Sequence, residues 1–428
     1  MFKISEIYNS KKVLETITNI YNKNFEEALR NINLVVKEYP NISITDWENA
    51  IKVYKSTLTL EINKEKILTN IGVFLFKLGK INQSITIFEN LTKKNPNFIL
   101  GHNNLGISYL EIGMFQQAIH HFVLALNTDD NDFNARRNLI NILTLSRPYE
   151  LEKHPLIDLN NKIIDISNKN KINNFYEINI IKNILKECFD AINDFDKTLF
   201  LNETQIFRKN EKNLDCYRHF KVFNKFNIIP EYCFSCYKVQ INLFQIVDLV
   251  KLYLMFDNLY LENNNLRKCM VETRKNIKGN YKGYIYCEGL KDAENIFTKV
   301  QDEILKLELH EYKITIKHGC SEFYNSYPDF EKINFKGQQI MNYNKRWKNK
   351  EKLIDDSQPI RLKIDEKIRS NTLKGINLAD ILTIKNWINY ANTVEDYSYK
   401  KIFDKKIEKN FINKILEGQE TFRKVNFN

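Results

Sequence analysis

Asn70-Ile71-Gly72 is followed 34 residues later by Asn104-Leu105-Gly106, and after another 34 residues by Asn138-Leu139. Around these segments, apolar residues fall on one face of two successive helices. A spacing that keeps both asparagine and glycine in register predicts a stack of similar helical pairs near the N-terminus. Four further pairs of positions keep the same spacing: Gly79 and Gly113, Ser84 and Ala118, Phe88 and Phe122, and Leu91 and Ala125.

The 34-residue register is clear over residues 65–98 and 99–132, and a third unit begins at Phe133 and loses the pattern after Leu145. Upstream, residues 25–40 and 46–59 carry the apolar spacing of further repeat helices. The period and the residue order resemble the tetratricopeptide repeat, a helix–turn–helix unit that stacks into a peptide-binding superhelix. The resemblance covers about residues 9–145.

The resemblance implies that the first helix of each unit lines the concave surface of the stack. Asn70, Asn104 and Asn138 then occupy one shared position, and Arg137 adds a positive charge beside it. An amide side chain both donates and accepts hydrogen bonds, so a row of them can grip an extended peptide backbone. We expect a protein or peptide partner in this groove. The alternative is that asparagine recurs there only because the chain is rich in it.

Beyond the repeats, residues 146–214 read as a helical connector. From Cys233 onwards the apolar period changes, and alternation over 237–241, 269–273, 283–287 and 312–318 predicts four strands. Helices are predicted at 244–256 and 293–304. The order strand, helix, strand, strand, helix, strand is that of a split βαβ, or ferredoxin-like, domain. The Lys-rich region after Pro328 predicts further helices at 378–391 and 399–417.

The fold class expected is therefore mainly α with an α+β part. It comprises a helical repeat domain over 1–145, the connector, a zinc-stabilised ferredoxin-like domain over 215–325, and a helical C-terminal region over 326–428.

Four potential zinc ligands precede the first predicted strand. They form a C-x2-H pair, a gap of 13 residues, and a C-x2-C pair. Two ligands three positions apart can both face inward on one tight loop, and zinc prefers four Cys or His ligands in a tetrahedron. We expect one zinc ion at this site. The alternative is ordinary buried thiols and a surface histidine. The four candidate ligands are Cys216, His219, Cys233 and Cys236.

His318 and Cys320 follow the fourth predicted strand, which can end at the same edge of the sheet as the C-x2-C pair begins. Either residue can replace one ligand of the zinc site, or His318 can support a ligand from behind. The nearest carboxylates in the sequence, Glu231 and Glu322, are weak candidates for a general base. We therefore favour a structural zinc over a catalytic one, and we predict no catalytic residues.

One face of the predicted sheet is basic and aromatic. Lys282-Gly283-Tyr284-Ile285-Tyr286 is similar to part of the third-strand signature of the RNA-recognition motif, where aromatic side chains stack on bases. It departs from that signature at Ile285, where a small residue is expected. The alternative is that the C-terminal helices cover this face. The residues that would contact RNA are Lys238, Arg274, Tyr284, Tyr286, Lys313 and Lys317.

The 428 residues carry a formal net charge of +11, which favours an acidic partner, and are 43% apolar, which allows sizeable cores. Seven cysteines are an odd number and do not suit a secreted disulfide framework. The first residues lack the apolar segment of a signal peptide, and no stretch is apolar enough to span a bilayer. We therefore expect a cytoplasmic protein that does not bind membranes.

No phosphate-binding loop, zinc-protease or serine-hydrolase motif occurs in the sequence. The function expected is a protein-interaction adaptor rather than an enzyme. Two alternatives remain: RNA binding through the open sheet face, and an enzyme that uses zinc or a thiol near His318.

Overall fold

The structure is a computed structural model that describes residues 10–58, 63–169, 176–208, 214, 216–274, 278–357 and 371–404. The chain divides into two compact units. Unit 1 contains residues up to Ile142 together with Arg147–His154, and unit 2 contains Leu143–Ser146, Pro155–Asp355 and the chain from Arg369 onwards. In the described residues, no helix combines the length and the apolar character needed to cross a membrane.

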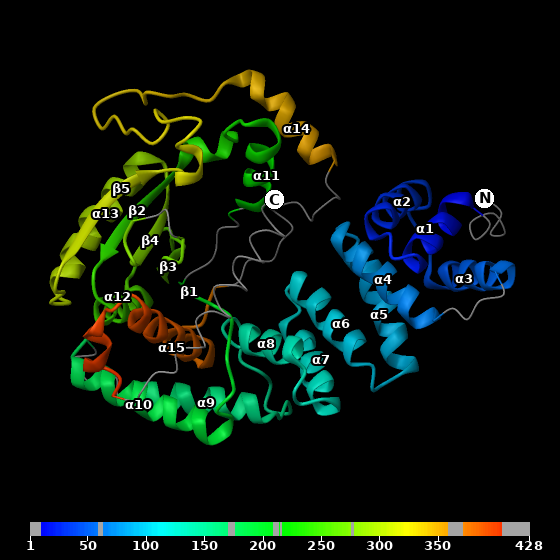
Figure 1. Cartoon of the computed structure of the whole chain (residues 1–428), viewed down its shortest axis with the longest axis horizontal. Coiled ribbons are helices and arrows are strands. Elements are labelled where there is room, and N and C mark those ends of the chain that lie inside the picture. The colour runs from blue at the N-terminus through cyan, green and yellow to red at the C-terminus, as the bar shows by residue number, and fades with distance from the viewer. Residues whose placement is uncertain are drawn as a thin grey trace. The chain divides into compact units, whose positions relative to one another are not determined.

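Unit 1 is a run of helices paired in chain order, and Figure 1 shows it in blue and cyan. Its helices fall at the spacing that the repeat predicts, because each buries one apolar stripe against its neighbours. The bounds are α1 Lys11–Tyr21, α2 Phe25–Glu38, α3 Ile44–Leu58, α4 Lys64–Lys77, α5 Ile81–Lys94, α6 Ile99–Glu111, α7 Phe115–Thr128 and α8 Phe133–Ile142.

The repeated glycine lets the two helices of a unit touch. A Cβ atom at Gly72 would lie 2.7 Å from Cζ of Phe88, and one at Gly106 would lie 2.5 Å from Cε1 of Phe122. Both phenylalanines are fully buried. The glycine and the phenylalanine recur together because the ring on the second helix of each pair fills the space that the missing side chain leaves on the first.

Unit 2 combines seven helices of the described residues with one antiparallel sheet, shown in green, yellow and orange in Figure 1. The strands are β1 Gln205–Arg208, β2 Cys236–Leu243, β3 Arg267–Val271, β4 Tyr281–Glu288 and β5 Tyr312–His318. The helices are α9 Pro155–Lys169, α10 Ile178–Phe195, α11 Cys216–Phe226, α12 Ile246–Asn258, α13 Gly289–Leu305, α14 Lys348–Ser357 and α15 Leu378–Thr393.

The sheet has the strand order β1-β3-β4-β2-β5, with every neighbouring pair antiparallel. The four predicted strands and the two helices between them lie where the alternating and helical patterns placed them. Val239, Ile241 and Ile285 are fully buried on the face that packs against α12 and α13. A 3-10 turn at Glu231–Ser235 leads into β2, and another at Ser321–Phe323 follows β5.

Within residues 146–214, which were expected to form a helical connector with loops, the structure also contains the strand β1. It is four residues long and pairs with β3 at the edge of the sheet. So short a segment offers too few positions for alternation to be recognised. Arg208, the last residue of β1, anchors the strand, because its guanidinium donates hydrogen bonds to Asp257 at 2.8 Å and to Asp380 at 2.5 Å.

The helix α15 packs against the segment that directly precedes β1. Asn386 donates to the carbonyls of Leu201 and Glu203, and the indole of Trp387 donates to the carbonyl of Thr204 at 2.9 Å. This helix confirms the one predicted at 378–391. The helix predicted at 399–417 overlaps a short 3-10 turn at residues 397–401. The residues from 405 onwards lie outside the described part of the chain.

Candidate functional site

The shared asparagines of unit 1 lie on α4, α6 and α8, and all three are half-buried. Asn70 donates through Nδ2 to the carbonyl of Lys66 at 2.8 Å, and Asn104 donates in the same way to the carbonyl of Leu100. Asn138 instead donates to Oδ1 of Asn103, which lies on α6. The first two amides therefore have the same local geometry, and the third links two successive first helices.

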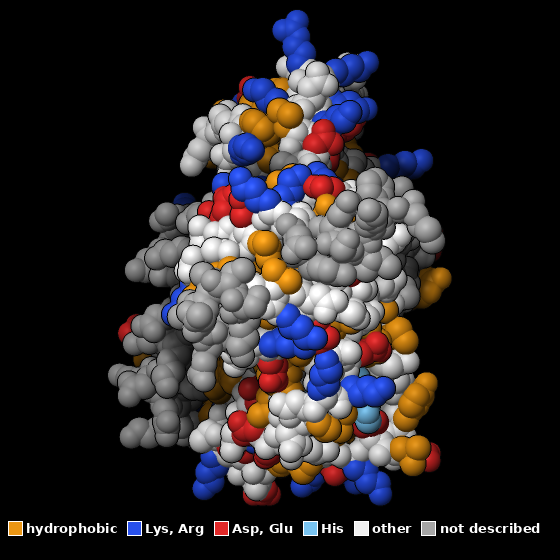
Figure 2. Space-filling model, turned by 90° about the vertical axis from the view of Figure 1, so that its right-hand side faces the viewer, with side chains coloured by type: hydrophobic (Ala, Val, Ile, Leu, Met, Phe, Trp, Pro, Cys, Tyr) orange, Lys and Arg blue, Asp and Glu red, His pale blue; other side chains and the backbone are white. Residues whose placement is uncertain are grey.

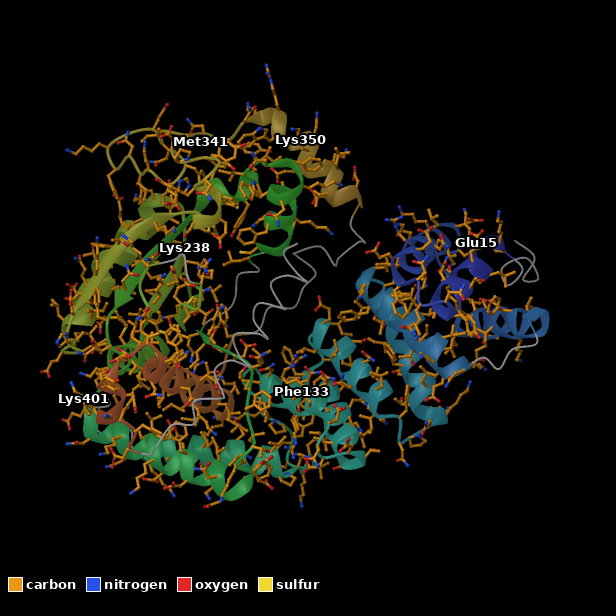
Figure 3. All side chains as sticks on the ribbon, viewed as in Figure 1. Glu15, Phe133, Lys238, Met341, Lys350 and Lys401 are labelled. Carbon is orange, nitrogen blue, oxygen red and sulfur yellow. The ribbon has the colours of Figure 1, made fainter. Side chains whose placement is uncertain are left out.

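Exposed apolar and basic side chains lie on the same helices as two of these asparagines. Leu100 is 50% exposed on α6, and Phe133, labelled at the start of α8 in Figure 3, is 45% exposed. The guanidinium of Arg137 is exposed and lies 5.9 Å from the centre of the Phe133 ring. Figure 2 shows one face of the molecule, on which exposed hydrophobic side chains lie singly or in small groups among charged ones.

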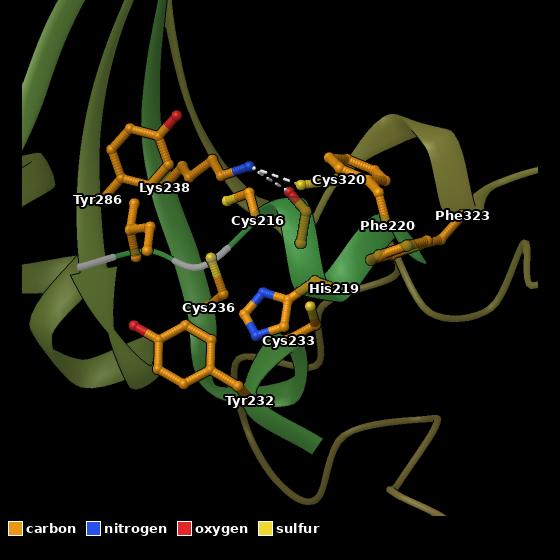
Figure 4. Close-up of a pocket in the computed structure, with 12 residues that line it drawn as sticks. Cys216, His219, Phe220, Tyr232, Cys233, Cys236, Lys238, Tyr286, Cys320 and Phe323 are labelled. Carbon is orange, nitrogen blue, oxygen red and sulfur yellow. Dashed lines mark hydrogen bonds between the residues drawn. The ribbon is translucent and has the colours of Figure 1, made fainter. Parts of the chain in front are cut away.

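A second candidate site is a small pocket in unit 2, to which α11, the turn at 231–235, the start of β2 and the chain just after β5 all contribute (Figure 4). The pocket brings together all four predicted zinc ligands, and it adds Cys320. No disulfide bond joins any of the seven cysteines, all of which lie in the described part of the chain. The residues that the pocket gathers for possible ligation are Cys216, His219, Cys233, Cys236 and Cys320.

Strand pairing brings Cys320 to Cys236. Tyr237 and His318 are paired across β2 and β5, and the N–H of Gly319 donates to the carbonyl of Cys236 at 2.8 Å. Gly319 has a φ of +60°, and a Cβ atom there would lie 2.2 Å from Phe330. Only glycine allows the chain to turn at this point, so the turn that delivers Cys320 to the pocket depends on it.

Burial raises the pKa values of two thiols of the pocket, those of Cys216 and Cys233. Burial, and then the neighbouring thiols of Cys320 and Cys236, raise the pKa of Cys216 to about 12. The pKa of Cys233 is raised further by burial and by the thiols of Cys320, Cys236 and Cys216. The mutual influence shows that the four sulfurs share one environment.

In the described part of the chain, no three His, Cys, Asp or Glu side chains lie close enough together to hold a metal ion. The thiols converge on one pocket without meeting in a tetrahedron.

His318 is not available as a ligand in this arrangement. Its Nδ1 lies 2.6 Å from the carbonyl oxygen of Phe330, and its Nε2 lies 3.1 Å from that of Phe234. The ring is also stacked on Tyr237 at a centroid distance of 4.4 Å. His219 is buried and stacked on Tyr232 at 5.2 Å. Both ring nitrogens of His318 therefore face backbone carbonyls in this structure, and its role as a replacement zinc ligand stays a prediction.

Lys238, expected on an open face of the sheet, is buried. Figure 3 marks it on β2, and its ammonium donates to the carbonyl of Gly319 at 2.9 Å and to Sγ of Cys320 at 3.1 Å. Lys268, half-buried on β3, donates to Oε1 of Gln205 at 2.8 Å and lies against the rings of Phe207 and Tyr284. Burial, and then repulsion by Lys238, lower the pKa of Lys268 to about 8.

Other cations of the same face are matched by carboxylates. Arg274 pairs with Glu272 and Glu322, Lys282 pairs with Glu272, and Lys317 pairs with Glu331. Burial raises the pKa of Glu272, but Arg274 and Lys282 outweigh it and lower the value to about 2. Tyr284 and Tyr286 are half-buried, and only Lys313 of the predicted RNA contacts is exposed. The face is therefore not the open basic surface that was expected.

Two features of these sites were not predicted from the sequence. The contact of Lys238 with Cys320 joins positions 82 residues apart. In unit 1, Nδ1 of His102 lies 3.0 Å from Nδ1 of His121, and Nε2 of His102 lies 2.9 Å from the carbonyl oxygen of Pro96. Alternation on β2 placed Lys238 on one face of the sheet but gave no sign of what covers it.

Comparison with known proteins gives short matches. A peroxisomal targeting signal receptor from Candida glabrata is 22% identical over 121 residues, which are 26% of this chain and 20% of that protein. The uncharacterized protein ycf37 from Pyropia yezoensis is 26% identical over 110 residues, which are 25% of this chain and 62% of that protein. Both are consistent with the 34-residue helical pairs of unit 1. Part of this chain is built from tetratricopeptide-type repeats.

No protein-family model matches the chain. A solved structure of MamA (AMB-1) is 13% identical and covers 30% of this chain and 76% of that chain, with a TM-score of 0.20, which is too low to support a fold assignment. The chain spans less than two thirds of the length of either curated relative.

Proposed function

We propose that this chain is a protein-interaction adaptor whose tetratricopeptide-type repeats hold an extended segment of a partner protein. The observation that carries the proposal is the row of asparagines at one position of successive first helices, Asn70, Asn104 and Asn138. The similarity of part of the chain to a peroxisomal targeting signal receptor supports a role in protein recognition.

The chemistry of the row suits a peptide backbone. Each of Asn70 and Asn104 uses one N–H on its own helix, which holds the amide in place. A primary amide has a second N–H and an oxygen with two lone pairs, so it can still donate and accept. Because the amide is already oriented, little side-chain freedom is lost when a peptide binds.

Neighbouring side chains indicate the peptide's composition. The exposed guanidinium of Arg137 suits a carboxylate, and Leu100 and Phe133 offer exposed apolar surface on the same set of helices. The preferred ligand is therefore an extended segment with an acidic group and at least one apolar side chain.

The test is selection of peptides from a random library by the full chain, followed by affinity measurements on variants. We expect Asn104→Ala to weaken the selected peptide about fivefold to tenfold, the loss of about one hydrogen bond or slightly more. Asn127→Ala, an exposed position on α7, is the matched control and should leave affinity unchanged. Binding that is indifferent to substitution at all three asparagines would overturn the proposal.

In this proposal the α/β part of unit 2 is a split βαβ, or ferredoxin-like, domain that one structural zinc stabilises. Support comes from the order β2-α12-β3-β4-α13-β5, from the strand order β3-β4-β2-β5, and from the pocket that collects four cysteines. Neither alternative function has comparable support. On the sheet face, carboxylates pair with Arg274, Lys282 and Lys317, and Lys238 is buried. Both nitrogens of His318 face backbone carbonyls.

A further inference from the structure

The buried charge beside the cysteine pocket is not balanced by carboxylates. Lys238 contacts a carbonyl and a thiol, and Lys268 contacts an amide oxygen and two aromatic rings. In the described part of the chain, neither lysine pairs with an aspartate or a glutamate. A buried ammonium without a counter-charge is costly, so an anion belongs close to these two groups.

We infer that Cys216, Cys233, Cys236 and Cys320 bind one zinc ion as four thiolates, with Lys238 and Lys268 as their counter-charges and with His219 outside the ligand set. This inference rests on the structural zinc of the proposed function and replaces the histidine of the predicted ligand set by Cys320. Four thiols lose four protons when they bind Zn²⁺, and the resulting centre carries a charge of about −2. The two lysines match that charge.

The backbone favours Cys320 over His219. The paired strands β2 and β5 and the bond from Gly319 to the carbonyl of Cys236 fix Cys320 beside the C-x2-C pair. Lys238 already donates to the sulfur of Cys320, and such a hydrogen bond stabilises a thiolate. The ring of His219 is stacked on Tyr232 and would have to give up that contact to reach a metal. Figure 4 shows the sulfurs of Cys216 and Cys320 close to the Lys238 ammonium.

The inference requires the cysteine side chains to rotate from their present positions, in which no metal-binding group is formed among the described residues. Cys216 begins α11, Cys236 begins β2, and the N–H of Cys236 bonds to the carbonyl of Cys233, so each thiol sits at the end of a fixed element. A rotation about χ1 moves each sulfur without a change in the backbone. The site would then be closed by protein ligands, as structural zinc sites are.

The test is the metal content of the purified full chain, measured by elemental mass spectrometry beside matched variants. We expect about one zinc per wild-type chain, loss of zinc in Cys320→Ser, and retention in His219→Ala. Cys287→Ser, a buried thiol elsewhere on β4, is the control and should retain the metal. Retention in Cys320→Ser with loss in His219→Ala would overturn the ligand set. Wild-type protein without zinc, purified with zinc supplied, would overturn the zinc proposal itself.

A second measurement keeps the inference testable if Cys320→Ser fails to fold. Cobalt(II) exchanged into the wild-type chain should show thiolate-to-metal charge-transfer absorption of the strength given by about four thiolates. His219→Ala should leave this spectrum unchanged. A spectrum with the strength of three thiolates that changes in His219→Ala would instead show the histidine to be a ligand.

Discussion

At the scale of single residues, glycine and phenylalanine positions decide how closely the repeat helices pack. A side chain at Gly106 would meet the buried ring of Phe122, and the same holds for Gly72 and Phe88. This contact explains why the sequence pattern was strong enough to reveal the repeat. The pairing is local, within one helical pair, so its signature survives in the spacing of residues alone.

We predict that Gly106→Ala destabilises unit 1 by about 1–3 kcal/mol, because the added methyl group must displace a fully buried ring. Chemical denaturation followed by circular dichroism measures this. Gly337→Ala is the control, since its nearest neighbour is the end of an Asn334 side chain 3.2 Å away. An equal effect at both positions would contradict the packing argument.

The histidine pair of unit 1 predicts a pH dependence. Burial, and then the charges of His102 and His120, lower the pKa of His121 from its ordinary value of 6.5 to about 4. The unfolded chain therefore binds a proton more readily than the folded one between these values. Stability is complete above about pH 6.5 and is lost as the pH falls towards 4, by about 3 kcal/mol.

Thermal unfolding of the full chain between pH 7 and pH 4 checks this sign. His121→Gln should flatten the dependence, because a neutral amide takes no proton. His120→Gln, which removes a more exposed imidazole paired with Glu152, should flatten it less. A wild-type melting temperature that rises on acidification would contradict the assignment.

At the scale of elements, long regular patterns were predictable and short ones were not. The strands β2, β4 and β5 are each seven or eight residues long, and the sequence pattern located them. The four-residue strand β1 was not predicted from the sequence. It is fixed by Arg208, whose partners Asp257 and Asp380 lie 49 and 172 residues away, and such distant pairing leaves no periodic signal.

We predict that Arg208→Met destabilises unit 2 by about 3–5 kcal/mol, because it leaves two buried carboxylates without their cation. Arg30→Met is the control for a cation with an exposed partner and should cost about 0.5 kcal/mol or less. Both values come from denaturant unfolding curves. A small effect for Arg208→Met would show that β1 does not depend on this contact.

The candidate sites were predictable to different degrees. The C-x2-H and C-x2-C spacing indicated that the ligands converge, and the structure brings those residues and Cys320 to one pocket. The burial of Lys238 was not predictable, because the residues that enclose it come from α11 and from the chain after β5. Charge balance on the sheet face was hidden for the same reason, since Arg274 and Glu322 lie 48 residues apart.

At the scale of the whole molecule, the chain combines a repeat unit proposed to hold a peptide with an α/β unit proposed to hold zinc. Each unit has its own buried core. We therefore predict that removal of zinc by a chelator lowers the stability of unit 2 and leaves peptide binding by unit 1 within about twofold of its original affinity. Affinity measured before and after chelation checks this. A large loss of binding would mean that the two units act together.

The measurement that tests the central claim most directly is hydrogen exchange of the full chain with and without a selected peptide. If the row of asparagines holds the peptide, exchange should slow chiefly in α4, α6 and α8, the helices that carry Asn70, Asn104 and Asn138. Slowed exchange confined to α5 and α7, or to unit 2, would contradict it.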